Sequence, residues 1–225
     1  IVAKCEGFIM TKFCRIDRGK EKDIVLLHGW ATDGRVFDLL DIDYNYILPN
    51  DFLPESFENE LLDLMSSHRK NKISLLGWSM GGFAAADFAI KHTELVEKLI
   101  LMSVKEKYDR ESINKIKGII REGKKGYLYS FYLDCFCESE KEKLKWFRAN
   151  LMKDYLTNFS TEHLLKGLDY LASSSFDIQR LNELNPEIIY GMKDKIIPVN
   201  EIIFLKEKLP SAKFTFLENM GHMPF

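Results

Sequence analysis

One five-residue segment, from Gly77 to Gly81, places a serine between two glycines in the spacing Gly-x-Ser-x-Gly. The spacing alone is a weak signal, but an apolar run, KISLL, precedes it and a small-residue stretch, GGFAAADFAIK, follows its serine closely. We therefore predict a strand, a tight turn and a helix, the arrangement that exposes a nucleophilic hydroxyl above a sheet. Ser79 is the predicted nucleophile, and the alternative is a glycine-rich turn with an incidental serine.

A nucleophilic serine needs a base, and His222 is the best placed of the five histidines. It follows the apolar run KFTFL in a loop marked by Gly221 and Pro224. Asp194, which follows the run EIIY, is the predicted acid that orients the imidazole; the alternative is a turn aspartate that caps the next helix. The chain order serine, aspartate, histidine, each after a predicted strand, favours one shared site.

Acyl transfer through a serine also needs donors for a developing oxyanion. The backbone N–H of Met80, at the start of the predicted helix, is one candidate donor. The early strand ends in His28-Gly29-Trp30, so we predict that the N–H of Trp30 is the second donor and that its indole borders the acyl pocket. His28 itself is interpreted as a loop histidine that holds the turn by hydrogen bonds.

The elements that must position these residues are short apolar runs that alternate with helical patterns. Strands are predicted at Phe8–Ile16, Asp23–Leu27, Tyr44–Leu48, Lys72–Leu76, Lys98–Met102, Glu187–Tyr190 and Lys213–Leu217. Helices are predicted at Ser56–Ser67, with Ser56 as N-cap, and at Gly81–Lys91 and Asn200–Leu209. The alternation predicts an α/β fold, with a mostly parallel central sheet flanked by helices on both faces.

The segment 105–181 breaks this rhythm, because it contains no convincing strand and many aromatic residues. Its pattern predicts helices at Arg110–Arg121, Gly126–Cys137, Glu140–Lys153 and Thr161–Leu171. We interpret it as a helical cap inserted into a core formed by residues 1–104 and 182–225.

Composition narrows the possible partners. Hydrophobic residues make up 46% and charged residues 29%, and the net charge is -2 with a pI of about 6.3. This balance is typical of a soluble globular protein and argues against a nucleic-acid partner. No apolar run is long enough to span a membrane, and residues 1–10 do not read as a signal peptide, so a cytoplasmic location is expected.

The four cysteines, Cys5, Cys14, Cys135 and Cys137, form neither a dense disulfide framework nor a recognisable zinc-ligand pattern. We expect reduced, partly buried thiols and no metal. The proposed chemistry needs no organic cofactor either.

Four motifs occur in order, LLHGW, GWSMGG, YGMKDKIIP and GHMPF. Together they are typical of the α/β-hydrolase superfamily, and over essentially the whole chain the sequence resembles the pimeloyl-[acyl-carrier protein] methyl ester esterases of biotin synthesis. The resemblance implies a serine carboxylesterase that cleaves the methyl ester of a carrier-bound pimeloyl chain through an acyl-enzyme. Ser79, Asp194 and His222 would be its triad.

The resemblance also implies a substrate site and a partner. Trp30, Ser79, Met80 and His222 would line the substrate channel, together with Phe131, Tyr132, Leu133, Asp134 and Cys135. In the family, basic residues of the cap contact the acyl carrier protein. The candidates here are Lys125, Lys143, Lys145 and Arg148, and the alternative is a solvated helix face.

One departure concerns the end of the sequence, three residues after His222. The family continues into a closing helix, so without it the loop that carries His222 is expected to be poorly anchored.

Several other activities fit the same motifs. A general short-acyl carboxylesterase is the main alternative, and thioesterases, lipases, C–C bond hydrolases and cofactor-free perhydrolases of this fold remain open. From a different class, the chain could be a non-catalytic binding protein on a hydrolase scaffold.

Overall fold

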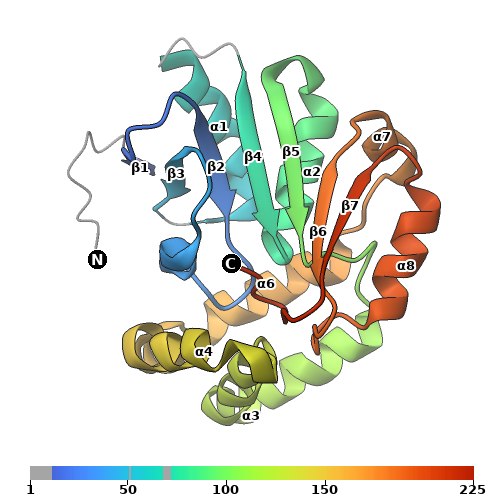
Figure 1. Ribbon diagram of the computed structural model, residues 1–225. Coiled ribbons are helices and arrows are strands. Elements are labelled where there is room, and N and C mark those ends of the chain that lie inside the picture. The colour runs from blue at the N-terminus through green and yellow to red at the C-terminus, as the bar shows by residue number, and fades with distance from the viewer. Residues whose placement is uncertain (1–11, 51, 68–71) are drawn as a thin grey trace.

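A computed structural model describes residues 12–50, 52–67 and 72–225. Its centre is a seven-stranded sheet with the order β1-β3-β2-β4-β5-β6-β7 (Figure 1). Only β1 runs antiparallel to its neighbour, β3, and every other pair is parallel. The strands are β1 (Phe13–Ile16), β2 (Asp23–Leu27), β3 (Asn45–Pro49), β4 (Ile73–Trp78), β5 (Val96–Met102), β6 (Glu187–Gly191) and β7 (Lys213–Leu217).

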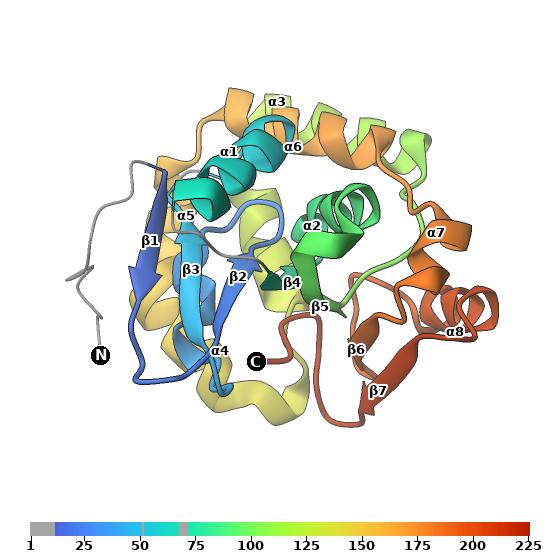
Figure 2. The same ribbon diagram turned by 90° about the horizontal axis from the view of Figure 1, so that it is seen from above.

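The central strands read as unbroken apolar runs because they are covered on both sides. Every residue of β4 is buried, and so are four of the five residues of β2. Helices α1 (Pro54–Ser67) and α2 (Met80–Lys91) cover one face, and α8 (Val199–Lys208) lies beside the last strands (Figure 2). The predicted mostly parallel sheet with flanking helices is therefore confirmed.

The opposite side of the central strand is covered differently from what the sequence suggests. Gly77 faces α2, so Trp78, the next residue, points to the other face of the sheet. There Trp78 packs against Phe225, which also contacts Phe37 in the short 3₁₀-helix η1 (Gly34–Leu39). A short 3₁₀-helix and an aromatic cluster thus cover this part of a sheet for which helices were expected on both faces.

Three boundaries differ from the predictions. Helix α1 begins at Pro54, because proline is well tolerated in the first helical turn, and Ser56 lies inside that turn instead of capping it. Strand β4 runs two residues further than predicted, through Gly77 and Trp78. Of the predicted strand Phe8–Ile16, the part from Phe13 forms β1, and residues 8–11 lie outside the described part of the chain.

Residues 105–181 form helices and turns, with one isolated bridge between Lys107 and Ser175 near their two ends. The two helices predicted first are the two halves of α3 (Arg110–Asp134), which meet at a kink where Gly123 has a non-helical backbone. The segment continues through η3 (Glu138–Glu140), α4 (Lys141–Phe147), a π-helical turn η4 (Arg148–Met152), α5 (Lys153–Asn158), α6 (Thr161–Ser173) and α7 (Ile178–Glu183). Helices α3, α4 and α6 lie across the carboxyl ends of the strands (Figure 1).

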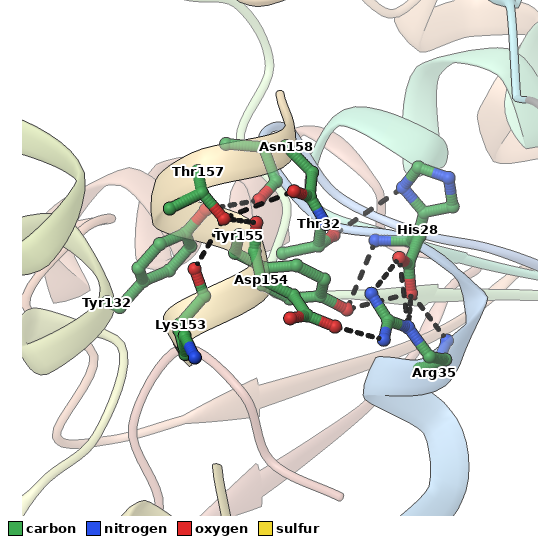
Figure 3. Close-up of polar contacts among 11 residues, drawn as sticks. His28, Thr32, Arg35, Tyr132, Lys153, Asp154, Tyr155, Thr157 and Asn158 are labelled. Carbon is green, nitrogen blue, oxygen red and sulfur yellow. Dashed lines mark hydrogen bonds and ion pairs between the residues drawn. The ribbon is translucent and has the colours of Figure 1, made fainter. Parts of the chain in front are cut away.

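A polar network joins this helical segment to the loop after β2. The hydroxyl of Tyr155 donates to Asp33 Oδ1 at 2.8 Å, and Arg35 Nη1 lies 3.0 Å from Asp154 Oδ2. Figure 3 shows Arg35 reaching from η1 toward Asp154 and Tyr155 of α5. Charge-assisted bonds of this kind fix the loop against the helices.

Two buried hydrogen bonds hold the start of the same loop. Tyr132 of α3 donates its hydroxyl proton to the carbonyl of Ala31 at 2.6 Å, and the indole N–H of Trp30 donates to the carbonyl of Leu164 at 2.9 Å. The helical segment therefore fixes the position of Trp30 as well as covering it.

The expectation of reduced, partly buried cysteines holds only in part. Cys135 and Cys137 are free and buried, but Cys14 in β1 is disulfide-bonded, which the spacing of four cysteines did not reveal. No helix in the described ranges combines the length and apolar character needed to cross a bilayer.

The close approach of α2 to the sheet yields a stability prediction. A Cβ at Gly81 would overlap the backbone of Leu27 and His28, which cannot move without disturbing β2. We expect Gly81→Ala to cost about 3 kcal/mol, or roughly 6–12 °C in Tm, measured by thermal unfolding. Gly118→Ala in α3 is the control, because outside its own helical turns no atom of the described residues lies within 4 Å of its added Cβ, and it should gain about 0.5–1 kcal/mol. Equal melting temperatures for both variants would contradict the packing described.

Candidate active site

Ser79 occupies the sharp turn between β4 and α2, as the sequence predicts. Its backbone has φ 53° and ψ -116°, a left-handed conformation that costs free energy for any residue other than glycine. Gly77 and Gly81 permit this turn, since a Cβ on either would overlap the backbone of an adjoining element. The strain holds the serine hydroxyl at the carboxyl edge of the sheet.

Three side chains from distant parts of the chain meet at this edge. Ser79 Oγ lies 3.0 Å from His222 Nε2, and His222 Nδ1 lies 2.7 Å from Asp194 Oδ2. All three residues are buried, and the side chain of Asp194 has no exposed area. Because both contacts are shielded from water, each is stronger than the same contact on a surface.

The carboxylate of Asp194 is fixed by its own loop. Its second oxygen, Oδ1, accepts hydrogen bonds from the backbone N–H groups of Ile196 at 2.8 Å and Ile197 at 2.9 Å. Helix α8 begins later, at Val199, so Asp194 does not cap it. The alternative role as a helix cap is therefore not what the structure shows.

The loop that carries His222 is firmly anchored, contrary to the expectation from the short C-terminal sequence. The indole N–H of Trp78 donates to the His222 carbonyl at 2.7 Å, and the N–H of His222 donates to the carbonyl of Cys135 at 2.9 Å. Phe225 is buried against Phe37 and Trp78. These contacts hold the His222 loop against β4, η1 and the turn after α3.

Trp30 lines the same pocket as Ser79, and Met80 follows Ser79 in the chain. Among the described residues, the N–H groups of Trp30 and Met80 have no hydrogen-bond partner. Met80 opens α2, where the first N–H groups of a helix have no intrahelical acceptor and the helix dipole favours negative charge. An anionic oxygen next to Ser79 would therefore find unpaired donors. His28, as predicted, stays in the turn, with Nδ1 2.9 Å from the carbonyl of Gly29.

A pocket of about 320 Å³ opens at Ser79 between the sheet edge and the helical segment. Most of its lining is apolar or aromatic, with a few polar groups, which is typical of a small-molecule site. Its lining residues are Trp30, Ser79, Lys105, Tyr108, Asp109, Ser112, Ile113, Ile116, Tyr127, Phe131, Leu168, Leu171, Lys195 and Ile196.

Of the segment predicted to line a channel, Phe131 lies at this pocket and the four residues after it do not. Tyr132 is buried against Phe147 and Tyr155, and Leu133 is only partly exposed. Asp134 is exposed to solvent, and the Cys135 backbone carbonyl binds the His222 loop. Because α3 turns one face to the core, consecutive residues could not all face the pocket.

The four basic residues predicted for a carrier protein have different surroundings. Lys125, Lys145 and Arg148 are exposed, and Lys145 lies 3.9 Å from Glu142. Lys143 is partly buried beside Glu140 and the sulfur of Met220, and burial lowers its pKa. Lys143 is therefore part of the packing under the His222 loop, whereas the other three side chains are exposed to solvent.

Sequence reasoning missed Tyr108 and Glu140. Tyr108 lines the pocket beside Ser79, and burial raises the pKa of its phenol, an effect that an interaction with the Ser79 hydroxyl opposes. Glu140 is buried under the His222 loop. Neither residue belongs to a recognised motif. For Tyr108, the one available signal was that it follows an apolar strand, and for Glu140 the sequence offered none.

A parallel sheet with a buried serine, histidine and aspartate at its carboxyl edge defines the α/β-hydrolase class. Residues 59–225 match the family model Hydrolase_4, described as serine aminopeptidase, S33. The chain therefore belongs to this family of α/β hydrolases.

Curated relatives share about a quarter of the sequence over almost the whole chain. The pimeloyl-[acyl-carrier protein] methyl ester esterase of Legionella pneumophila (strain Paris) is 26% identical over 228 residues, covering 92% of this chain and 90% of that protein. The esterase of the same name from Chromobacterium violaceum is 24% identical over 237 residues, with 92% and 89% covered. The resemblance inferred from the motifs is thus confirmed.

Solved structures share the fold at lower identity. A thermophilic esterase from Thermogutta terrifontis superposes with a TM-score of 0.77 at 20% identity, over 94% of this chain and 86% of that one. An esterase from Exiguobacterium antarcticum gives a TM-score of 0.75 at 18% identity, over 93% and 88%. These likenesses confirm the α/β-hydrolase fold.

Proposed function

We propose that the protein is a serine carboxylesterase that acts through an acyl-enzyme on Ser79. The observation that carries this proposal is the buried chain of contacts from Ser79 Oγ to His222 and on to Asp194, at 3.0 and 2.7 Å. The hydrolase family and the esterase relatives support the reaction class.

In this mechanism His222 accepts the Ser79 proton through Nε2 while Oγ attacks the ester carbonyl. Asp194 accepts the Nδ1 proton, which selects the reactive tautomer and stabilises the imidazolium. The N–H groups of Trp30 and Met80 bind the oxyanion, and loss of one such donor typically costs about 3–4 kcal/mol of barrier. His222 then protonates the leaving alcohol, and water repeats the cycle on the acyl-enzyme.

We further propose that residues 105–181 are a cap that shapes the acyl site, inserted into a core of residues 1–104 and 182–225. Helices α3 and α6 supply Ile113, Ile116, Tyr127, Phe131, Leu168 and Leu171 to the pocket wall. A wall of this composition favours a medium acyl chain over a charged or very small one.

The methyl ester of a pimeloyl chain carried by an acyl carrier protein is the substrate we propose, with biotin synthesis in the cytoplasm as its setting. Two esterases of this name, from Legionella pneumophila and Chromobacterium violaceum, align over nine tenths of the chain. The exposed Lys125, Lys145 and Arg148 support contact with an acidic carrier. Lys143 contributes less, since it is engaged with Glu140.

Complementation of a biotin auxotroph that lacks its methyl ester esterase tests this substrate. We expect growth without biotin when the wild-type chain is expressed and none with Ser79→Ala, which controls for expression of an inactive protein. Failure to complement, with full turnover of simple p-nitrophenyl esters, would instead support a general short-acyl carboxylesterase. A protein that turned over neither substrate would be a binding protein on this scaffold.

A further inference from the structure

The turn after α3 contacts the loop of His222 through a series of hydrogen bonds. The backbone carbonyl of Cys135 accepts from the N–H groups of His222 at 2.9 Å and Met223 at 3.3 Å. Ser139 donates its hydroxyl proton to the carbonyl of Asn219 at 2.7 Å. The loop that carries the proposed base is therefore held from the side of the helical segment, and not only by the sheet.

Glu140 brings a carboxylate into this contact, and it is buried, at 4% exposure. Its Oε2 accepts two backbone hydrogen bonds, from Gly221 N at 2.7 Å and from Cys137 N at 3.0 Å. One oxygen thus joins the turn of the helical segment to the residue directly before His222. A Cβ at Gly221 would press on this same oxygen, so the fit between them is close.

The cost of burying this carboxylate argues for a specific role. Its other oxygen, Oε1, has no hydrogen-bond partner among the described residues, and the ammonium of Lys143 lies 3.8 Å away. Burying a carboxylate without a full set of hydrogen bonds destabilises the fold, and an apolar side chain in its place would avoid that desolvation free energy. Only the two backbone N–H groups it holds need an acceptor here.

We propose that Glu140 is a positioning residue for His222, fixing Gly221 so that the imidazole stays within reach of both Ser79 and Asp194. It does not touch the reacting atoms. The inference rests on the proposed role of His222 as base, and it makes the helical segment part of the catalytic geometry as well as a wall of the pocket.

The two backbone bonds end on a single oxygen, which makes the conservative variant informative. In Glu140→Gln the amide oxygen can replace Oε2 and accept both N–H groups. The amide nitrogen then takes the place of Oε1, which accepts no hydrogen bond among the described residues and lies 3.8 Å from Lys143 Nζ. Glu140→Asp keeps the charge but withdraws the acceptor by one methylene. Glu140→Ala leaves two buried N–H groups without an acceptor, so the loop must shift to satisfy them.

The test measures kcat and KM on a short p-nitrophenyl ester, per active site titrated with a fluorophosphonate. For Glu140→Asp and Glu140→Ala we expect kcat to fall about 10²-fold with little change in KM, because a displacement of about 1 Å in a catalytic group costs that much. Glu140→Gln should keep kcat within about threefold of wild type. The exposed neighbour Glu138→Gln is the matched control and should leave both constants unchanged.

Several outcomes would overturn the proposal. A kcat per titrated site within threefold of wild type for both Asp and Ala would mean that Glu140 only stabilises the fold. Loss with Gln and retention with Asp would mean that its charge matters and the geometry does not. If the alanine variant does not fold, the Asp and Gln pair decides between these readings.

A second readout does not depend on turnover. The imidazole proton shared by His222 and Asp194 should give a far-downfield proton resonance, retained in Glu140→Gln and shifted or lost in Glu140→Asp. If the wild type shows no esterase activity, the proposed function fails, and this resonance still reports whether Glu140 sets the position of the imidazole. An unchanged resonance in Glu140→Asp contradicts the positioning role.

Discussion

Replacing Ser79 by alanine is expected to lower kcat for ester hydrolysis by at least about 10³-fold while the protein keeps its fold. The variant removes the only hydroxyl within reach of His222 Nε2 among the described contacts, so the acyl-enzyme cannot form. Residual catalysis would come from the oxyanion donors and from binding alone. Steady-state kinetics on a p-nitrophenyl ester, with circular dichroism to confirm folding, measure this effect.

Ser103 supplies a matched control for this variant. It is also a buried serine with a positive φ, 50°, directly after the neighbouring strand β5, and its hydroxyl has no hydrogen-bond partner among the described residues. Ser103→Ala should leave kcat within about twofold of wild type. Like Ser79→Ala it removes a buried serine hydroxyl, but this hydroxyl does not contact His222. Equal losses in the two variants would mean that Ser79 matters for packing and not for chemistry.

The second large effect is expected for Asp194→Asn, with a loss of about 10³–10⁴-fold in kcat. The asparagine oxygen can keep the bonds to the N–H groups of Ile196 and Ile197, so the loop should hold its shape. Its amide nitrogen then faces His222 Nδ1 as a donor. The imidazole must accept there and carry its proton on Nε2, which leaves it unable to take the Ser79 proton.

Asp177→Asn is the control for this substitution. Asp177 also accepts a backbone hydrogen bond within its own turn, from Arg180 N at 3.1 Å, but it caps α7 and does not line the pocket. Its kcat should be unchanged. If Asp194→Asn kept more than a tenth of wild-type kcat, Asp194 would not be the residue that orients the base.

Much of the core could be predicted because its strands are buried on both faces. Strand β2 matches its predicted bounds, Asp23–Leu27, since a central parallel strand reads as a continuous apolar run between polar turns. Helix α2 was located nearly as well, because small residues must face the sheet where the turn at Ser79 brings the backbones together. Local sequence determines both features.

The pocket and the contacts of the His222 loop depend on tertiary packing, so the local sequence does not predict them. Phe131 and Tyr132 are adjacent aromatic residues, yet one lines the pocket and the other is buried in the helical segment. Glu140 stands in a charged stretch that reads as a solvated helix face, and only the fold brings Gly221 against it. The orientation of a helix about its axis and long-range backbone contacts cannot be inferred from residue types in one segment.

In the proposed mechanism the hydroxyl of Ser79 is activated by its contact with His222. Labelling with a fluorophosphonate, followed by digestion and mass spectrometry, tests it directly, since such probes react with activated serines. We predict one adduct, on the peptide that contains Ser79, and a loss of that adduct in His222→Ala. An unlabelled Ser79 in the folded wild-type protein, or equal labelling when His222 is removed, would contradict this activation of the serine by the histidine.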